Sequence, residues 1–316
     1  MRGERGFALV VTLIITALLV ALLVEFVNEV YVDTSHSKNF VASQQAEILA
    51  ESGIAGGIKL LQFSGSLRKG GEYTSLLDLW AKPFTHETEV GRVLISIEEE
   101  SGKLDLNSVV SQTGVPSEFH KDIFLRLLTN LKLSPELYEA LADWLDSDAT
   151  PRPNGAENNY YLSLKPPYQA HNNRFDTLEE LALVRGFTPE VLARLRPYVT
   201  VYGSGLETGA QTALININTA PKELLAALDD RLMRGDLADQ ILEYRKSKPI
   251  QSLTAVSGME SIGMDLQSFR ANCKGTTYRI RSEGKVGESV SVAEAVVTNV
   301  DPQKQSNPTV LYWREY

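Results

Sequence analysis

The sequence is poor in the residues that most often carry catalysis or cross-links. Its 316 residues include one cysteine and four histidines. Cys273 cannot form a disulfide within the chain, and the simplest interpretation is a small buried side chain. The histidines lack the spacing of a two-histidine zinc site, and neither a Gly-x-Ser-x-Gly motif nor a Walker-type phosphate loop occurs. The sequence therefore predicts a protein that is not an enzyme.

Positive charge is also in short supply. Lysine and arginine number 31 against 40 aspartate and glutamate residues, which gives a formal net charge of −9. A surface that binds the phosphates of nucleic acid needs an excess of basic side chains, so no nucleic-acid partner is expected. With 43% hydrophobic and 22% charged residues, the chain has the composition of an ordinary globular protein.

Charge is missing altogether from one long apolar segment near the N-terminus. Residues 7–24 contain no charged side chain. As a helix, this segment would be about 27 Å long, close to the thickness of the hydrocarbon core of a bilayer. Arg2 and Arg5 precede it, whereas Glu25 and Glu29 follow it, so the basic side is expected to stay in the cytoplasm. The segment predicts a single membrane-spanning helix.

The junction before this segment differs from an ordinary secretory signal, which is cut after its apolar stretch at a site of small residues. Here the small residue, Gly6, comes before the apolar stretch, and no such site follows Val24. A short charged leader that ends in glycine before phenylalanine resembles the type IV prepilin signal. That resemblance implies that a prepilin peptidase cuts residues 1–6 from Phe7, which is then N-methylated. An uncleaved anchor is the alternative.

The helical pattern continues beyond the membrane segment, and strands follow it. Apolar residues recur at three-, four- and seven-residue steps, so one membrane and spine helix is expected over residues 7–62. Residues 63–105 are expected to form the first part of an antiparallel sheet, with strands at 90–98 and 103–107. Residues 276–316 are expected to complete that sheet. The fold class is therefore α+β, with the region between as a helical insertion.

The helical region contains a loose internal repeat, over residues 106–202 and 203–275. Each copy has an extended lead-in, two helices and a short third helix that glycine stops, at Gly186 and Gly258. Asn107 and Asn218 are read as helix starts. The copies resemble SAM and helix-hairpin-helix modules, but acidic residues outnumber basic ones, so the repeat is expected to serve packing.

The densest polar group follows the second helix of the first copy. Asp146, Asp148, Thr150, Asn154 and Glu157 have the spacing of positions 1, 3, 5, 9 and 12 in an EF-hand calcium loop. Hard oxygen ligands of this kind suit calcium. A proline stands where that loop needs glycine, so a loop with a backbone path of its own is expected.

Asp143 precedes this loop by one helical turn and is near enough to face Asp146 from the helix. Carboxylates this close repel one another, and a cation would relieve the repulsion. Asn158 and Asn172 are weaker candidate ligands. Whether one ion or two would bind is open, and a solvated acidic loop without an ion is the alternative.

Several stretches carry a resemblance to a known family. They are residues 142–157, 160–162, 178–181 and 216–220, together with the leader and Val11, which stands where most pilins have glutamate at the fifth mature position. Here the chain resembles the general secretion pathway protein K family, the large minor pseudopilins of type II secretion systems. The resemblance covers nearly the entire mature chain.

The resemblance implies a pilin-like helix packed on a small sheet, with a helical insertion that binds structural calcium. By matching motif it implies Asp143, Asp146, Asp148 and Glu157 as ligands. It also implies a single-pass protein of the inner membrane with its body in the periplasm. The implied partners are the I- and J-type minor pseudopilins, the major pseudopilin and prepilin peptidase. The implied role is to initiate or cap the pseudopilus at its tip.

Two hypotheses from other classes remain at this point. One is a membrane-tethered nucleic-acid binder that uses the helical repeats, which the acidic composition disfavours. The other is a calcium-dependent exported hydrolase in which Asp143 and Asp146 act as an acid pair.

Overall fold

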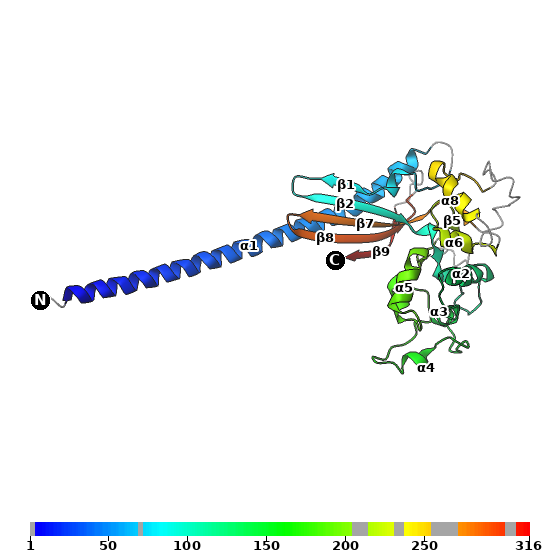
Figure 1. Ribbon diagram of the computed structural model, residues 1–316, viewed down its shortest axis with the longest axis horizontal. Helices are drawn as coiled ribbons and strands as arrows, with labels where there is room; N and C mark the ends of the chain where they lie inside the picture. Colours follow the sequence, from blue (N-terminus) through cyan, green and yellow to red (C-terminus); the bar gives the residue numbers. More distant parts are fainter. Residues whose placement is uncertain (1–3, 69–71, 204–213, 231–236, 254–270, 301–307) are drawn as a thin grey trace.

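The fold is α+β, and it consists of one long helix, a five-stranded sheet and a helical body (Figure 1). It is known from a computed structural model that describes residues 4–68, 72–203, 214–230, 237–253, 271–300 and 308–316. The α-helices are α1 (Glu4–Ser66), α2 (Glu118–Asn130), α3 (Leu137–Leu145), α4 (Asn158–Tyr161), α5 (Pro189–Leu195), α6 (Lys222–Ala227) and α8 (Leu237–Ser247). The strands are β1 (Phe84–Glu87), β2 (Arg92–Glu99), β3 (Leu104–Asp105), β4 (Val199–Thr200), β5 (Ile215–Asn216), β6 (Ala271–Asn272), β7 (Thr277–Val286), β8 (Ser289–Thr298) and β9 (Thr309–Glu315).

Helix α1 has a free half and a packed half. Its N-terminal half projects away from the rest of the molecule (Figure 1). The large apolar side chains of the membrane segment are exposed on it. Its most apolar window has a mean hydropathy of 3.1, which makes it long and apolar enough to cross a membrane. From Ala46 onward the helix buries one face, through Ala50, Ile54 and Leu61, against the sheet. One helix thus joins the apolar segment to the folded body.

The sheet is antiparallel, with strand order β1-β2-β7-β8-β9. Side chains of one face pack against α1, among them Ile95 of β2, Ile280 of β7 and Ala295 of β8. Gly53 lies so close to the sheet that a Cβ there would be 1.9 Å from Ser282 Oγ, and Gly284 meets the backbone of α1 in the same way. Glycine in the helix at Gly53 and in the strand at Gly284 therefore lets α1 and β7 approach each other closely.

The helical body is an insertion between two neighbouring strands of this sheet. β2 ends at Glu99, and its partner β7 begins only at Thr277, with Glu99 opposite Tyr278. Everything between them leaves and re-enters the sheet at one end. That end is the one away from the free half of α1, and α2, α3, α4 and α5 lie beside it, below the sheet in this view (Figure 1).

The insertion contains two short parallel strand pairs of the same kind. β3 pairs in parallel with β4, with Leu104 opposite Val199, and β5 pairs in parallel with β6, with Ile215 opposite Ala271. Each copy thus begins on a short strand and returns beside it. The stop predicted at Gly258 lies outside the described residues, whereas Gly186 has the expected positive φ, +86°.

A buried asparagine in the lead-in of each copy forms hydrogen bonds to two later segments of that copy. Asn107 Nδ2 donates to the carbonyls of Phe175 (3.0 Å) and Val201 (2.9 Å), and its Oδ1 accepts from the Phe175 backbone N–H (2.8 Å). Asn218 does the same in the second copy: its Nδ2 donates to the carbonyls of Ile250 (2.8 Å) and Cys273 (3.4 Å). Its Oδ1 accepts from the Ile250 N–H at 2.8 Å. Each asparagine therefore ties the lead-in to two later segments of its own copy.

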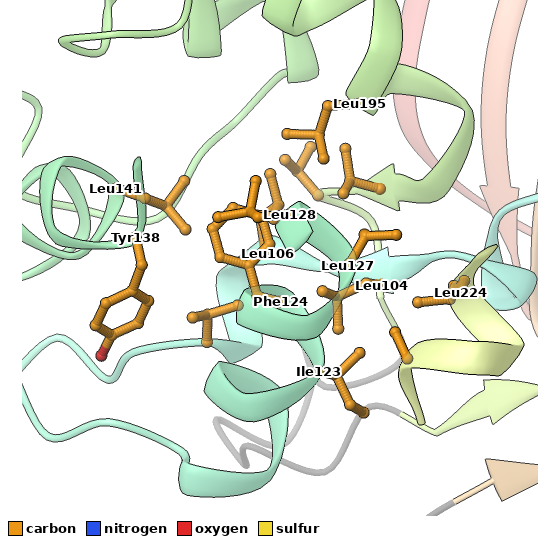
Figure 2. Packing of buried hydrophobic residues seen from close by; sticks show 14 of the residues in the cluster. Leu104, Leu106, Ile123, Phe124, Leu127, Leu128, Tyr138, Leu141, Leu195 and Leu224 are labelled. Atoms are coloured by element: carbon orange, nitrogen blue, oxygen red, sulfur yellow. The ribbon is translucent and has the colours of Figure 1, made fainter. Parts of the chain in front are cut away.

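The core of the insertion is continuous across both copies. Leu104 and Leu106 of the first lead-in, Phe124 of α2, Leu195 of α5 and Leu224 of α6 are all buried in one cluster. Figure 2 shows these side chains converging from several elements. The two copies therefore form one body.

Three predictions about the elements need correction. Residues 103–107 do not add a strand to the antiparallel sheet, because Leu104–Asp105 pairs in parallel inside the insertion. The second strand of the first part is instead β1. Asn107 does not start an α-helix either, because the next α-helix, α2, begins at Glu118. The Asn107 side chain instead forms hydrogen bonds to Phe175 and Val201.

Candidate metal centre

The candidate site is the loop that joins α3 to α4. α3 buries one face through Leu141 and Leu145, and its last turn carries Asp143. Aromatic rings hold the other end of the loop, because Tyr161 of α4 packs edge-on against Trp144 with ring centroids 5.1 Å apart. Both ends of the loop are therefore fixed on the core.

Three carboxylates of this loop converge. Oxygen atoms of Asp146, Asp148 and Glu157 all lie within 4.8 Å of one another. Asp146 is fully buried and Glu157 is 3% exposed, whereas Asp148 is exposed. We call these three residues the acidic cluster. The structure thus brings together three of the predicted ligands.

Several buried oxygens at this site have no hydrogen-bond partner among the described residues. They are Oδ1 of Asp146, both carboxylate oxygens of Glu157 and Oδ1 of Asn172. Asn172 also contacts the acidic cluster, because its Nδ2 donates to the Asp148 carbonyl at 3.1 Å. Leaving buried acceptors without donors is costly, and oxygen ligands of this kind suit a hard divalent cation. The donor set therefore fits calcium.

The electrostatics of Glu157 point the same way. Burial, followed by the negative charges of Asp143, Asp146 and Asp148, raises the pKa of Glu157 to about 7. The folded loop thus holds a carboxyl group that loses its proton only at a cost. A bound cation would favour the ionised form.

A cation of the protein itself occupies the other side of the site. Arg152 Nη1 lies 2.5 Å from Asp143 Oδ1 and 2.6 Å from Asp146 Oδ2. The Arg152 backbone N–H also donates to Asp143 Oδ2 at 3.1 Å. Asp143 is therefore paired with Arg152 and stands outside the acidic cluster.

The remaining predicted ligands lie elsewhere. Asn158 Oδ1 accepts a hydrogen bond from the Ala170 N–H at 2.8 Å, so it supports the following loop. Thr150 and Asn154 are exposed, and the Asn154 N–H donates to Glu139. The loop therefore departs from the backbone path of an EF-hand.

The side chain of Arg152 was missed from the sequence, where only its carbonyl was considered as a ligand. The available signal was the basic residue itself, set between two prolines in the middle of an acidic loop. The Arg152 side chain points toward Asp143 and Asp146 at the end of α3. The spacing of residues in the sequence does not reveal this direction.

A second group of carboxylates, Glu47, Glu51 and Glu315, gathers where α1 meets β9. Glu51 and Glu315 are exposed and Glu47 is half-buried. Glu47 accepts from Gln44 and Glu315 from Trp313. This group has the character of a solvated surface.

Family models and a curated relative that match this chain all describe the same family. Two models described as "Type II secretion system (T2SS), protein K" match residues 102–204 and 215–269. Type II secretion system protein K of Pseudomonas aeruginosa is 31% identical over 79% of this chain and 75% of its own length. The chain belongs to the type II secretion system protein K family. It is therefore a minor pseudopilin, a structural component of the secretion system and not an enzyme, as the sequence predicts.

Other members of the protein K family are also similar. The protein from Klebsiella pneumoniae is 31% identical over 58% of this chain and 57% of its own length. A crystal structure of the GspK-GspI-GspJ complex from enterotoxigenic Escherichia coli matches with a TM-score of 0.66 and 20% identity. That match covers 90% of this chain and 99% of the matched one, and it supports the fold. The apolar part of α1 is consistent with a membrane-anchored pseudopilin.

Proposed function

We propose that this minor pseudopilin sits at the tip of the type II secretion pseudopilus, where it initiates or caps assembly for the export of folded proteins. The observation that supports this most strongly is the helical insertion, which lies at the end of the sheet away from the free half of α1 (Figure 1). A subunit stacked above would have to accommodate that body. Membership of the protein K family supports the pseudopilin role, and neither nucleic-acid binding nor hydrolysis is favoured.

We propose further that the anchor spans the inner membrane, with the body in the periplasm. The apolar window of α1 and the basic residues before it support this orientation. We also propose that prepilin peptidase removes residues 1–6. Mass spectrometry of the protein from secreting cells is expected to give a chain that begins at N-methylated Phe7. A chain that retains Met1 in such cells would contradict the cleavage.

The proposed partners are the I- and J-type minor pseudopilins, with the major pseudopilin below them. The structural relative comes from a GspK-GspI-GspJ complex, and α1 here exposes Phe26, Val30 and Phe40 beyond the membrane segment. Exposed apolar side chains on a helix fit association with other helices. Co-expression with I- and J-type subunits of the same system is expected to yield one ternary complex. Recovery of this chain alone under the same conditions would contradict the proposal.

We propose that the acidic cluster binds calcium, which stabilises the insertion and takes no part in chemistry. Asp146, Asp148, Glu157 and the Oδ1 of Asn172 would hold the ion. Buried oxygens without donors, and carboxylates that repel one another when no cation is present, support the site. An ion there would join the end of α3 to the start of α4.

Chelation is expected to lower the melting temperature of the full chain in detergent micelles. At free calcium of about 100 times the dissociation constant, a folded-state ligand contributes about 2.7 kcal/mol. Asp148→Asn should lower the melting temperature in calcium and reduce the further loss on chelation. Asp176→Asn, an exposed change in the same domain, should leave the chelation effect unchanged. Equal melting temperatures with calcium and with chelator would contradict the site.

A further inference from the structure

β9 forms one edge of the five-stranded sheet. Among the described residues no strand pairs with its outer side, because β9 is the last strand in the order β1-β2-β7-β8-β9 (Figure 1). The opposite edge strand, β1, has four residues, whereas β9 has seven. A long edge strand presents unpaired backbone N–H and C=O groups, to which an extended segment of another chain can bind.

The backbone of Trp313 and Glu315 points toward this free edge. Val292 of β8 and Tyr316 exchange both of their backbone hydrogen bonds, at 2.9 and 3.0 Å. Hydrogen-bonded and non-hydrogen-bonded pairs alternate along an antiparallel ladder. In the register of β8 and β9, Trp313 and Glu315 therefore belong to non-hydrogen-bonded pairs. Their N–H and C=O groups face away from β8 and are left for a partner strand.

Helix α1 covers β8 but leaves the same face of β9 exposed. Ala295 of β8 is fully buried in the cluster beneath α1, whereas Trp313, which lies opposite it on β9, is 44% exposed. Val310 lies opposite the buried Val297 and is 49% exposed. The sheet thus extends one strand beyond the helix, and an apolar surface lies open beside α1.

Three carboxylates gather where α1 meets this face of β9. The oxygen atoms of Glu315 lie within 4.8 Å of those of Glu47 and Glu51. In the part of the chain that the structure describes, no lysine or arginine forms an ion pair with them. Like charges this close repel one another, and a basic side chain from a partner would relieve the repulsion. The charge of this surface therefore fits a segment that carries lysine or arginine.

The position of this surface on α1 indicates where the partner segment comes from. Phe40 and Gln44 precede Glu47 and Glu51 by seven residues each, so the four side chains share one side of the helix. Phe40 is 67% exposed, at the end of the free half of α1. A helix that packs against Phe40 would carry its own folded body alongside β9. This arrangement favours a neighbouring pseudopilin as the source.

We propose that a neighbouring minor pseudopilin adds an extended segment to β9, pairs with the backbone of Trp313 and Glu315, and places a lysine or arginine against the three carboxylates. The inference rests on the proposed association with I- and J-type subunits. The register shift between Val296 and Val297 interrupts the ladder, so the part of β9 that a partner can extend is residues 312–316. Cross-strand contact with Trp313 would add apolar burial.

Hydrogen–deuterium exchange of the full chain in detergent micelles tests the pairing, alone and in complex with the I- and J-type subunits of the same system. The backbone amides of residues 312–316 are expected to exchange about tenfold more slowly in the complex, because the outward N–H groups become hydrogen-bonded. The amides of β1, at the other edge, should exchange at the same rate in both samples.

Four variants separate the backbone contribution from the charge. Glu315→Pro removes the outward N–H and the carboxylate, whereas Glu315→Ala removes the carboxylate alone, so the proline variant should bind the I- and J-type pair about fivefold more weakly than the alanine variant. Glu51→Lys should weaken binding by about tenfold, because it repels the basic side chain of the partner. Glu87→Lys makes the same charge change on exposed β1 and should bind within about twofold of wild type.

The outcomes separate the strand pairing from the association on which it rests. A ternary complex in which β9 exchanges as fast as in the free chain would overturn the pairing and leave the association standing, and this holds even if Glu315→Pro does not fold. Wild-type binding by Glu51→Lys would overturn the basic partner segment. A dimer of this chain alone that protects β9 would assign the edge to a second copy. Failure to form any complex would overturn the proposed partners together with the inference.

Discussion

Replacing Asn107 by alanine is expected to destabilise the full chain by about 3–5 kcal/mol, and Asn218→Ala by a similar amount. Each side chain is buried and satisfies two carbonyls and one backbone N–H from segments far away in the sequence. Buried polar groups left without partners cost about 1–3 kcal/mol each. The measurement is chemical denaturation in detergent micelles, with the midpoint and slope both fitted.

Asn130→Ala is the control for these two variants. Asn130 is half-buried and makes one hydrogen bond, from its Nδ2 to the Glu223 carbonyl at 3.2 Å. Its loss is expected to cost about 1 kcal/mol. If Asn107→Ala and Asn218→Ala cost no more than this control, the asparagines do not hold the copies closed. Unequal costs for the two would mean that the copies are not energetically equivalent.

The second large effect is a pH dependence that comes from Glu99. This residue is 5% exposed, at the junction where β2 leaves the sheet for the insertion. Its two oxygens accept from Asn216 Nδ2 at 3.0 Å, and Arg68, Asp78 and Tyr278 are the charged and titratable groups near it. Burial raises the pKa of Glu99 from 4.5 to about 7.

Because folding raises the pKa of Glu99, this residue makes the folded chain less stable as the pH rises. Between pH 4.5 and 7 the folded chain holds a proton on Glu99 that the unfolded chain has lost, so the free energy of unfolding falls as the pH rises. The full effect of this one group is about 3 kcal/mol. Glu99→Gln should therefore gain stability relative to wild type between pH 5 and pH 8 by an amount of that order.

Denaturation of both chains at several pH values measures this difference. Comparison with a variant is needed because Asp105, another buried carboxyl, also has a pKa raised by burial, to about 6. Glu98→Gln changes the neighbouring, more exposed glutamate, whose ion pair is with Lys103, and should track the wild type across the range. A stability difference between Glu99→Gln and wild type that stays constant with pH would show that folding does not raise the pKa of Glu99.

The parts of the fold that could be predicted are those whose pattern is local. The spine helix was expected to end near residue 62, and α1 ends at Ser66. The alternation in residues 90–98 and 276–297 reports burial of one strand face, and β2, β7 and β8 follow it. Because β2 and β7 belong to one sheet, the residues between them in the chain must form an insertion, and this could be predicted from the two strand patterns.

What could not be predicted depends on distant partners. β1 has four exposed residues and no alternation, so only its pairing with β2 makes it a strand. Asn107 carries a helix-start signal in sequence, but the carbonyls of Phe175 and Val201 decide its role. In the acidic loop, the spacing of oxygen-bearing residues identified the carboxylates that converge. The direction of the Arg152 side chain and its ion pair with Asp143 depend on tertiary structure, so the sequence did not reveal them.

We propose that the chain stands at the top of the pseudopilus. This position is tested most directly by electron microscopy of pseudopili assembled in cells, with a gold-labelled antibody to the helical insertion. We expect one label at a single end of each filament and none along its length. Labels spaced along the shaft would contradict it, because the insertion would then be accommodated beneath further subunits.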